Sequence, residues 1–369
     1  MRCNLSVPFK LIKNELSIDM LRGGSLLGSG TYGCIFTPPL LCKDDTKTGK
    51  TRLGKITEPT DFVIEATAAK ILGPLGLPYF VLPDADSACI PDVKQREKEL
   101  AKCKMIKQDS DLEKVIQFTM PYAGKTLFSR IVDYDLLHGR TRFFDMMLQL
   151  LEAGAHLISA SYVHFDISIN NVVINDRGQT ALIDFGQSFS SKVITPAVLD
   201  VRRKVYDPIS MTEPPEVTLS QAPDLSADNV AYVIERKGTF ASAERVLGLK
   251  RVQQAAELRE FWTSSRAAQA GDWVTLWKLY WPTFDSWGIG GCLLEALQPL
   301  LYKKEFVDSP MWRRHGATIK SILRGMLQAN PRKRLDCVEA LKLYDPDNAW
   351  FEAHGTSWIA GREKQRAAS

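Results

Sequence analysis

Hydrophobic and polar residues follow two different patterns along the chain, and the first occupies the N-terminal third. LLGSGTYGCIF (26–36) places glycines between two apolar, β-prone runs, which predicts a strand, a turn and a second strand. RLGKI (52–56) predicts a third short strand. Residues 58–73 have apolar positions at helical spacing, with Thr60 as a candidate N-cap, and they predict a helix that ends at Gly73.

The pattern changes after KVIQFTMP (114–121), which predicts one more strand, stopped by proline. FFDMMLQLLEAGAHLISASYV (143–163) predicts a long apolar helix, and VVIN and TALIDFG, on either side of the turn NDRGQ, predict a hairpin within 172–186. Residues 186–240 are poor in pattern and rich in proline, serine and charge, which predicts a long surface segment. Helical spacing returns in three further stretches, 250–280, 284–300 and 309–328.

Length and composition add two expectations to this picture. A chain of 369 residues with 45% hydrophobic and 24% charged residues is typical of a globular protein with two domains or two lobes. The net charge of +4 comes without a concentrated basic run, so direct binding to nucleic acid is not expected. No apolar stretch approaches 18 residues and residues 1–25 lack the apolar core of a signal peptide, so we expect no membrane partner.

Cysteine usage points to a reducing environment. The seven cysteines are odd in number and scattered, and no two form a CxxC pair: they are Cys3, Cys34, Cys42, Cys89, Cys103, Cys292 and Cys337. This distribution argues against a disulfide framework and against a zinc site. A cytoplasmic location is therefore expected.

GSGTYG (28–33) matches the pattern GxGxxG, which is a weak signal when it stands alone. Here a strand follows the glycines and not the helix of a dinucleotide-binding fold. A glycine turn between two strands favours a flap over nucleotide phosphates, because backbone N–H groups can then approach phosphate oxygens. The candidate nucleotide-binding residues in this stretch are Leu27, Gly28, Ser29, Gly30, Gly33 and Ile35, with Ile35 expected to pack on adenine.

Lys55 and Glu65 are candidates for a second part of the nucleotide site. Lys55 lies on the predicted strand after the glycine turn, and Glu65 lies on the helix that follows. A lysine that binds α- and β-phosphates needs a carboxylate to hold its flexible side chain. Either residue considered by itself would more often be an ordinary surface residue.

HFDISINN (164–171) and IDFG (183–186) contain the strongest chemical signal. Asp166, Asn171 and Asp184 provide one carboxylate that could align an attacking hydroxyl and two oxygen donors for magnesium. Asp166, Lys55, Asn171 and Asp184 are the predicted catalytic set, with Asn171 and Asp184 as the metal ligands. His164 is expected to have a structural role.

The order of these motifs resembles that of the eukaryotic-type protein kinase family over residues 22–345. DSWGIG (285–290) and NPRKRL (330–335) continue the resemblance, since they are similar to the family's central C-lobe helix and to the arginine that closes that lobe. The resemblance implies an α+β, bilobal fold: an antiparallel β-sheet N-lobe with one helix, and a mainly α-helical C-lobe. The implied divisions are an extension (1–21), an N-lobe (22–120) and a C-lobe (121–369) with a large, mostly helical insertion around 217–284.

The resemblance also implies further site residues. MPYAG (120–124) would be the hinge, with Met120 as gatekeeper and Ala123 contributing an N–H to adenine. The partner of Arg334 is Glu216 of PPEV or Glu244 of SAER, and Glu216 is favoured because its proline is retained. LGSGTYGCIFTPPLLC looks like the N-lobe of serine/threonine kinases from nucleocytoplasmic large DNA viruses, which would place the protein in the host cytoplasm or the virion.

Two residues depart from the family's pattern. Phe165 replaces an arginine that pairs with a phosphorylated activation-loop residue in many kinases, so we expect no control by that route. Ser168 replaces a lysine that contacts the transferred phosphate, and Lys192 or Lys204 could substitute for it.

Two functions therefore stay open. The resemblance implies an ATP- and Mg²⁺-dependent kinase for serine or threonine hydroxyls of a protein substrate. The alternative is a nucleotide-binding pseudokinase that acts as a scaffold or regulator. A small-molecule substrate is less favoured, and the tail GREKQRAAS is expected to be frayed.

Overall fold

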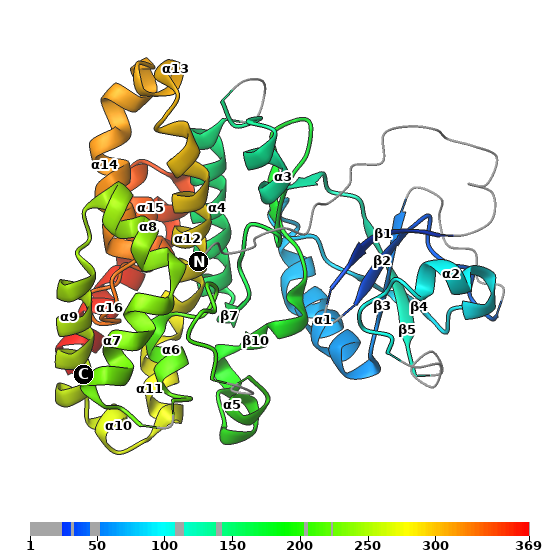
Figure 1. Ribbon diagram of the computed structural model, residues 1–369, viewed down its shortest axis with the longest axis horizontal. Coiled ribbons are helices and arrows are strands. Elements are labelled where there is room, and N and C mark those ends of the chain that lie inside the picture. Colours follow the sequence, from blue (N-terminus) through cyan, green and yellow to red (C-terminus); the bar gives the residue numbers. More distant parts are fainter. Residues whose placement is uncertain are drawn as a thin grey trace, which may run out of the picture. The chain divides into compact units, whose positions relative to one another are not determined.

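The computed structural model describes residues 24–30, 33–44, 52–107, 114–137, 142–202, 206–222 and 224–368 (Figure 1). The chain is a mixed α+β protein, and its backbone contacts divide it into two compact units. The first contains the described residues up to Pro59 together with Asp84–Met120, and the second contains Thr60–Pro83 and Pro121–Ser369. The predicted extension, residues 1–21, lies outside the described residues.

The first unit is built on a five-stranded sheet with the order β1-β2-β3-β5-β4. Its strands are β1 (Ser25–Ser29), β2 (Cys34–Thr37), β3 (Arg52–Thr57), β4 (Asp84–Cys89) and β5 (Ile116–Pro121). The pairs β1–β2, β2–β3 and β4–β5 are antiparallel. The short helix α2 (Glu97–Leu100) precedes a loop whose apolar side chains pack with those of β2 and β3 in a small core.

Two disulfides fix this unit, so the expectation that the cysteines stay unpaired is wrong. Cys34 is bonded to Cys103 and Cys42 to Cys89, with Cα atoms 5.9 and 5.8 Å apart. Disulfide formation requires close Cα atoms in space, a condition that the scattered sequence spacing could not reveal. Together the two bonds tie residues 34–42 to residues 89–103.

The second unit is mainly helical. Its helices are α1 (Pro59–Leu72), α3 (Leu127–Val132), α4 (Phe143–Ser159), α5 (Pro196–Arg202), α6 (Pro215–Leu219), α7 (Ala227–Arg236), α8 (Gly238–Leu247), α9 (Arg251–Ser264), α10 (Arg266–Gln269), α11 (Trp273–Tyr280), α12 (Phe284–Leu300), α13 (Lys304–Val307), α14 (Pro310–Met326), α15 (Cys337–Tyr344) and α16 (Thr356–Ala368). Five short strands accompany them: β6 (Lys125–Thr126), β7 (Tyr162–Val163), β8 (Val172–Ile174), β9 (Thr180–Leu182) and β10 (Phe189–Ser190). Strand β8 lies between β6 and β9, and β10 pairs with β7.

Helix α12 forms the centre of the second unit. Its residues from Phe284 to Leu294 are all buried, as expected for a helix that is apolar on every side. Gly288 lets the helix approach the loop before β8, because a Cβ atom at this position would lie 2.8 Å from the carbonyl oxygen of Ile167. The helix therefore packs directly against the backbone of this loop.

Three sequence-based expectations need correction here. The predicted helix 143–163 ends at Ser159, because Ser161 takes a left-handed conformation (φ 53°) before β7 begins. The segment 186–240 is only partly a surface segment, since α6 and Lys237 are buried. The expected frayed tail is helical through Ala368, and its Arg362 is buried beside Asp336 (Nε–Oδ2 3.2 Å). No helix among the described residues is long and apolar enough to span a membrane.

Candidate active site

The loop of residues 164–171, between β7 and β8, is fixed by two backbone hydrogen bonds to one carboxylate. Asp285 of α12 accepts from the N–H groups of His164 (Oδ2, 2.8 Å) and Phe165 (Oδ1, 2.8 Å). Burial raises the pKa of Asp285 to about 6, although both hydrogen bonds favour the ionised form. Phe165 itself has a left-handed backbone (φ 69°), and this turn in the chain presents both N–H groups to Asp285.

His164 links this loop to the segment that contains Asp184. Its Nδ1 accepts from the backbone N–H of Asp166 at 3.3 Å, so the proton lies on Nε2, which donates to the carbonyl of Ile183 at 3.0 Å. The ring also packs on Phe185, with centroids 4.5 Å apart. His164 is thus a structural residue that holds both chain segments in place.

The three predicted oxygen donors of the second unit lie together. Asn171 donates through Nδ2 to the carbonyl oxygen of Asp166 (2.8 Å) and to its carboxylate Oδ2 (3.0 Å). The backbone of Asn171 also accepts from the N–H of Ile183, beside Asp184, at 2.9 Å. Asp184 has a left-handed backbone (φ 65°), at the point where β9 ends and the DFG turn begins.

The carboxyl group of Asp166 is unusually easy to protonate. Partial burial raises its pKa to about 6, and the charge of Asp184 adds to this effect. Hydrogen bonds from the side chains of Thr212 and Asn171 oppose the shift, while the charge of Glu213 reinforces it. The two charged neighbours with the largest influence on the pKa of Asp166 are therefore carboxylates.

Glu65 belongs to the same neighbourhood. It is buried on α1, which is part of the second unit. A Cβ atom built on Gly186 would lie 3.7 Å from Oε1 of Glu65 and 3.3 Å from Oδ1 of Asp184. Both carboxylates thus flank the glycine of the DFG turn.

The glycine turn and Lys55 lie together in the first unit. Gly30 donates its N–H to the carbonyl of Gly33 (2.9 Å), and Ile35 lies opposite Lys55 in the sheet. A Cβ atom on Gly33 would lie 2.7 Å from the carbonyl of Ile56 and 3.1 Å from Cε of Lys55, so only glycine fits. Leu27, Gly28 and Ser29 belong to β1, whereas Thr31 and Tyr32 lie outside the described residues.

The predicted hinge, residues 120–124, begins at the end of β5. Met120 is the buried penultimate residue of that strand. Ala123 packs against Val81, Val173 and Ala181 in a small cluster of the second unit.

Glu216, and not Glu244, is the partner of Arg334. Nη1 and Nη2 of Arg334 lie 2.7 Å from Oε1 and Oε2 of Glu216, and both side chains are completely buried. Glu244 instead forms an exposed pair with Arg251 (2.9 Å). The choice made from the retained proline is confirmed.

Phe165 lies in an aromatic cluster that sequence reasoning did not anticipate. Its ring lies 5.5 Å from that of Phe189, 5.1 Å from Trp277 and 6.0 Å from Phe284. Trp277 comes from α11 in the predicted insertion, and its position in an apolar run gave no indication of this contact.

Lys192, one proposed substitute for a lysine at position 168, is exposed, and Lys204 lies outside the described residues.

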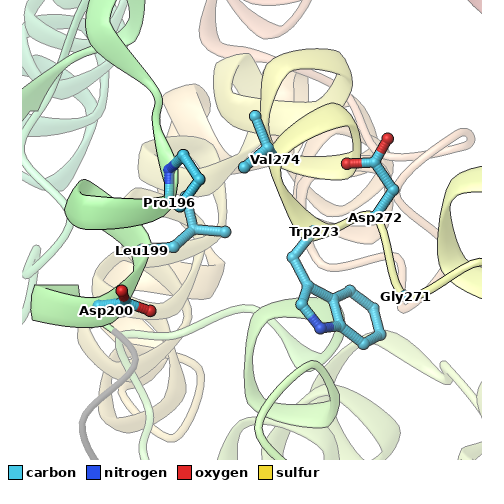
Figure 2. A pocket seen from close by; sticks show the side chains of 7 residues that line it. All are labelled: Pro196, Leu199, Asp200, Gly271, Asp272, Trp273 and Val274. Carbon is cyan, nitrogen blue, oxygen red and sulfur yellow. The ribbon is translucent and has the colours of Figure 1, made fainter.

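A pocket of about 170 Å³ lies elsewhere in the second unit, between α5 and the start of α11. The side chains of Pro196 and Leu199 face those of Val274 and Trp273 across it (Figure 2). None of its seven lining residues is a predicted site residue. Likewise, no group of three or more His, Cys, Asp or Glu side chains suited to a metal ion occurs in the described part of the chain.

No protein-family model matches this chain, and no curated protein matches it. The assignment of a function therefore depends on the residues and their geometry.

Proposed function

We propose that the protein is an ATP- and Mg²⁺-dependent protein kinase that phosphorylates serine and threonine hydroxyls. The observation that carries the proposal is the hydrogen bond from Asn171 Nδ2 to Asp166 Oδ2 (3.0 Å) beside Asp184. It supports the proposal because phosphoryl transfer requires an aligning carboxylate close to two oxygen donors for a metal.

Asp166 is assigned the alignment of the attacking hydroxyl. Its Oδ2 is held by Asn171, and its backbone is fixed through His164 and Asp285. A carboxylate that is held in this way can accept the hydrogen bond of a substrate hydroxyl without first reorganising.

Asn171 and Asp184 are assigned the metal. Because Nδ2 of Asn171 makes both hydrogen bonds with Asp166, the amide oxygen is the group left for a cation. An amide oxygen and a carboxylate are hard donors that suit Mg²⁺. Bound there with ATP, Mg²⁺ would neutralise charge on the phosphates.

The remaining roles are assigned to the nucleotide. Backbone N–H groups of the turn between Gly28 and Gly33 would bind phosphate oxygens, and Lys55 would bind the α- and β-phosphates with Glu65 as its partner. The adenosine would be contacted by four further residues, Leu27, Ile35, Met120 and Ala123.

Ser168 favours a second candidate function, that of a nucleotide-binding pseudokinase. The backbone carbonyl of Ser168 accepts from the N–H groups of Asn171 (2.9 Å) and Val172 (3.1 Å), so this residue helps to close the loop. Its side chain is a neutral hydroxyl and supplies no cation. The two charges with the largest effect on the pKa of Asp166, those of Asp184 and Glu213, are both negative. Loss of a positioned cation could reduce catalysis by several kcal/mol, and slow transfer is expected.

The test is transfer of labelled phosphate from ATP, with Mg²⁺, to the protein itself and to generic basic and acidic protein substrates. Asp166→Asn is expected to reduce the rate by about 10²- to 10⁴-fold. Ser168→Lys is expected to raise it. Binding of ATP without transfer in the wild type or either variant would favour the pseudokinase.

A further inference from the structure

Residues 210–213 connect the predicted insertion to Asp166. Thr212 in this segment makes a side-chain hydrogen bond with Asp166. Two side chains from elsewhere hold the backbone on the N-terminal side of Thr212: Lys237 Nζ donates to the carbonyl of Ser210 (2.6 Å), and Trp287 Nε1 donates to that of Met211 (2.9 Å). The position of Thr212 therefore depends on these two donors.

The donor Trp287 belongs to α12 and is firmly packed. Its ring is completely buried, lies 5.2 Å from that of Phe240 and faces the guanidinium of Arg334 at 5.2 Å. This donor therefore belongs to the buried hydrophobic core of the second unit.

The donor Lys237 is more unusual. It lies at the junction of α7 and α8, inside the predicted insertion, and its side chain is completely buried. Burying a lysine is costly unless it gains partners. Here its partners are the carbonyl of Ser210 and the charges of Glu213, Asp207 and Glu216.

Glu213 completes the arrangement on the other side of Thr212. Its carboxylate accepts from Thr218 Oγ1 (3.2 Å) and Gln221 Nε2 (3.4 Å) and is attracted to Lys237. One buried ammonium group thus acts on both residues next to the pair Met211 and Thr212. Removing it would break the hydrogen bond to Ser210 and the attraction for Glu213, and of the two donors only Trp287 would then hold the backbone next to Thr212.

We propose that Lys237 is a positioning residue for Asp166: by holding the carbonyl of Ser210 and attracting the carboxylate of Glu213 it places Thr212 against the Asp166 carboxylate. This inference rests on the proposed kinase function and assigns a role to the insertion. The buried ammonium supplies from within the chain a cation that orders this segment without any phosphate group.

The experiment compares Lys237→Met with the matched control Lys250→Met, an exposed lysine in the same insertion. Lys237→Met is expected to lower kcat by about 10- to 100-fold, since small misplacement of a catalytic group has effects of this size. The KM for ATP should change less than about twofold, because uniform binding is not altered. Lys250→Met should behave as the wild type.

A coupling measurement separates positioning from a general loss of structure. If Lys237 acts through Thr212, the double variant Thr212→Ala/Lys237→Met should be no slower than the slower single variant. Effects of the two substitutions that multiply, or a wild-type kcat for Lys237→Met, would overturn the inference.

Two further measurements keep the inference testable if Lys237→Met folds poorly or transfer is absent. Lys237→Met/Glu213→Gln removes the buried charges of these two residues together and should fold while keeping the low kcat. In Lys237→Met, hydrogen exchange of the backbone amides of residues 210–213 should be faster than in the wild type and in Lys250→Met. Unchanged exchange would refute the tether itself, whereas faster exchange in a protein that transfers no phosphate would refute the kinase proposal and with it the positioning role.

Discussion

Arg334 and Glu216 form a completely buried, two-pronged ion pair across 118 residues of sequence, with both N–O distances at 2.7 Å. Arg334 Nε also donates to the carbonyl of Gln328 (2.8 Å), so each edge of the guanidinium is occupied. The pair joins α6, at the start of the predicted insertion, to the loop before α15. It fixes where the segment that contains Thr212 ends.

Breaking this pair from one side should be strongly destabilising. Glu216→Gln leaves the arginine charge buried without an opposite charge beside it, so the free energy of unfolding should fall by about 3–5 kcal/mol. Denaturant titration measures this loss. Glu244→Gln is the matched control, because the Glu244–Arg251 pair is exposed and should contribute little. Equal losses in the two variants would contradict the assignment of Glu216 as the buried partner.

Phe165→Arg should destabilise the protein and not create a phosphorylation switch. The ring of Phe165 is buried among Phe189, Trp277 and Phe284, and a guanidinium there would be an uncompensated charge. Loss of the packing alone costs about 3–5 kcal/mol, as for Phe→Ala in a core. Phe165→Leu should lose less, and thermal unfolding of the two variants distinguishes these outcomes. An arginine variant as stable as wild type would show that the cluster is not closely packed.

The cysteine pairs predict a defined alkylation pattern. In protein purified without reductant and then denatured, Cys292 and Cys337 should react with iodoacetamide, whereas the two disulfide pairs should react only after a dithiol is added. Peptide mass spectrometry reads this directly. Each bond closes a long loop, so Cys103→Ser should lower stability by about 2–4 kcal/mol. Alkylation of Cys34 and Cys103 without reductant would contradict the pairing.

Stability should depend on pH through Lys237. Burial lowers the pKa of Lys237 to about 8, although Glu213, Asp207 and Glu216 act in the opposite direction and Arg334 lowers it further. The unfolded chain, where the pKa is near its ordinary value of 10.5, then holds a proton above pH 8 that the folded protein has released. The stability of the wild type relative to Lys237→Met should therefore rise with pH above about 8. Denaturant titrations of both proteins at pH 7 and pH 9 test the sign, and a constant or falling difference would contradict it.

Local sequence patterns predicted much of this molecule. The hairpin of β8 and β9, the glycine turn between β1 and β2 and the apolar helix α12 depend on spacing and turn residues within a few positions. Asp166 and Asn171 come together because only four residues separate them in one tight loop. The mixed α+β class is confirmed, while the kinase architecture and the roles of the site residues stay predictions.

Contacts between distant segments could not be predicted from the sequence. Lys237 follows an ordinary amphipathic helix, and no pattern indicates that its side chain is buried against Ser210. Trp277 gave only the signal of an apolar helix, and the partners of Cys34 and Cys42 depend on how loops return to the sheet. Such contacts are set by tertiary packing, which overrides local preference.

The order of the strands has a consequence for how the chain is synthesised. In the first unit β3 lies between β2 and β5, yet β5 is made only after α1, which belongs to the second unit. Until Ile116–Pro121 leave the ribosome, β3 is an open edge whose N–H and C=O groups invite pairing with other chains. The two units are interleaved along the polypeptide, and no single proteolytic cut separates them into two complete fragments.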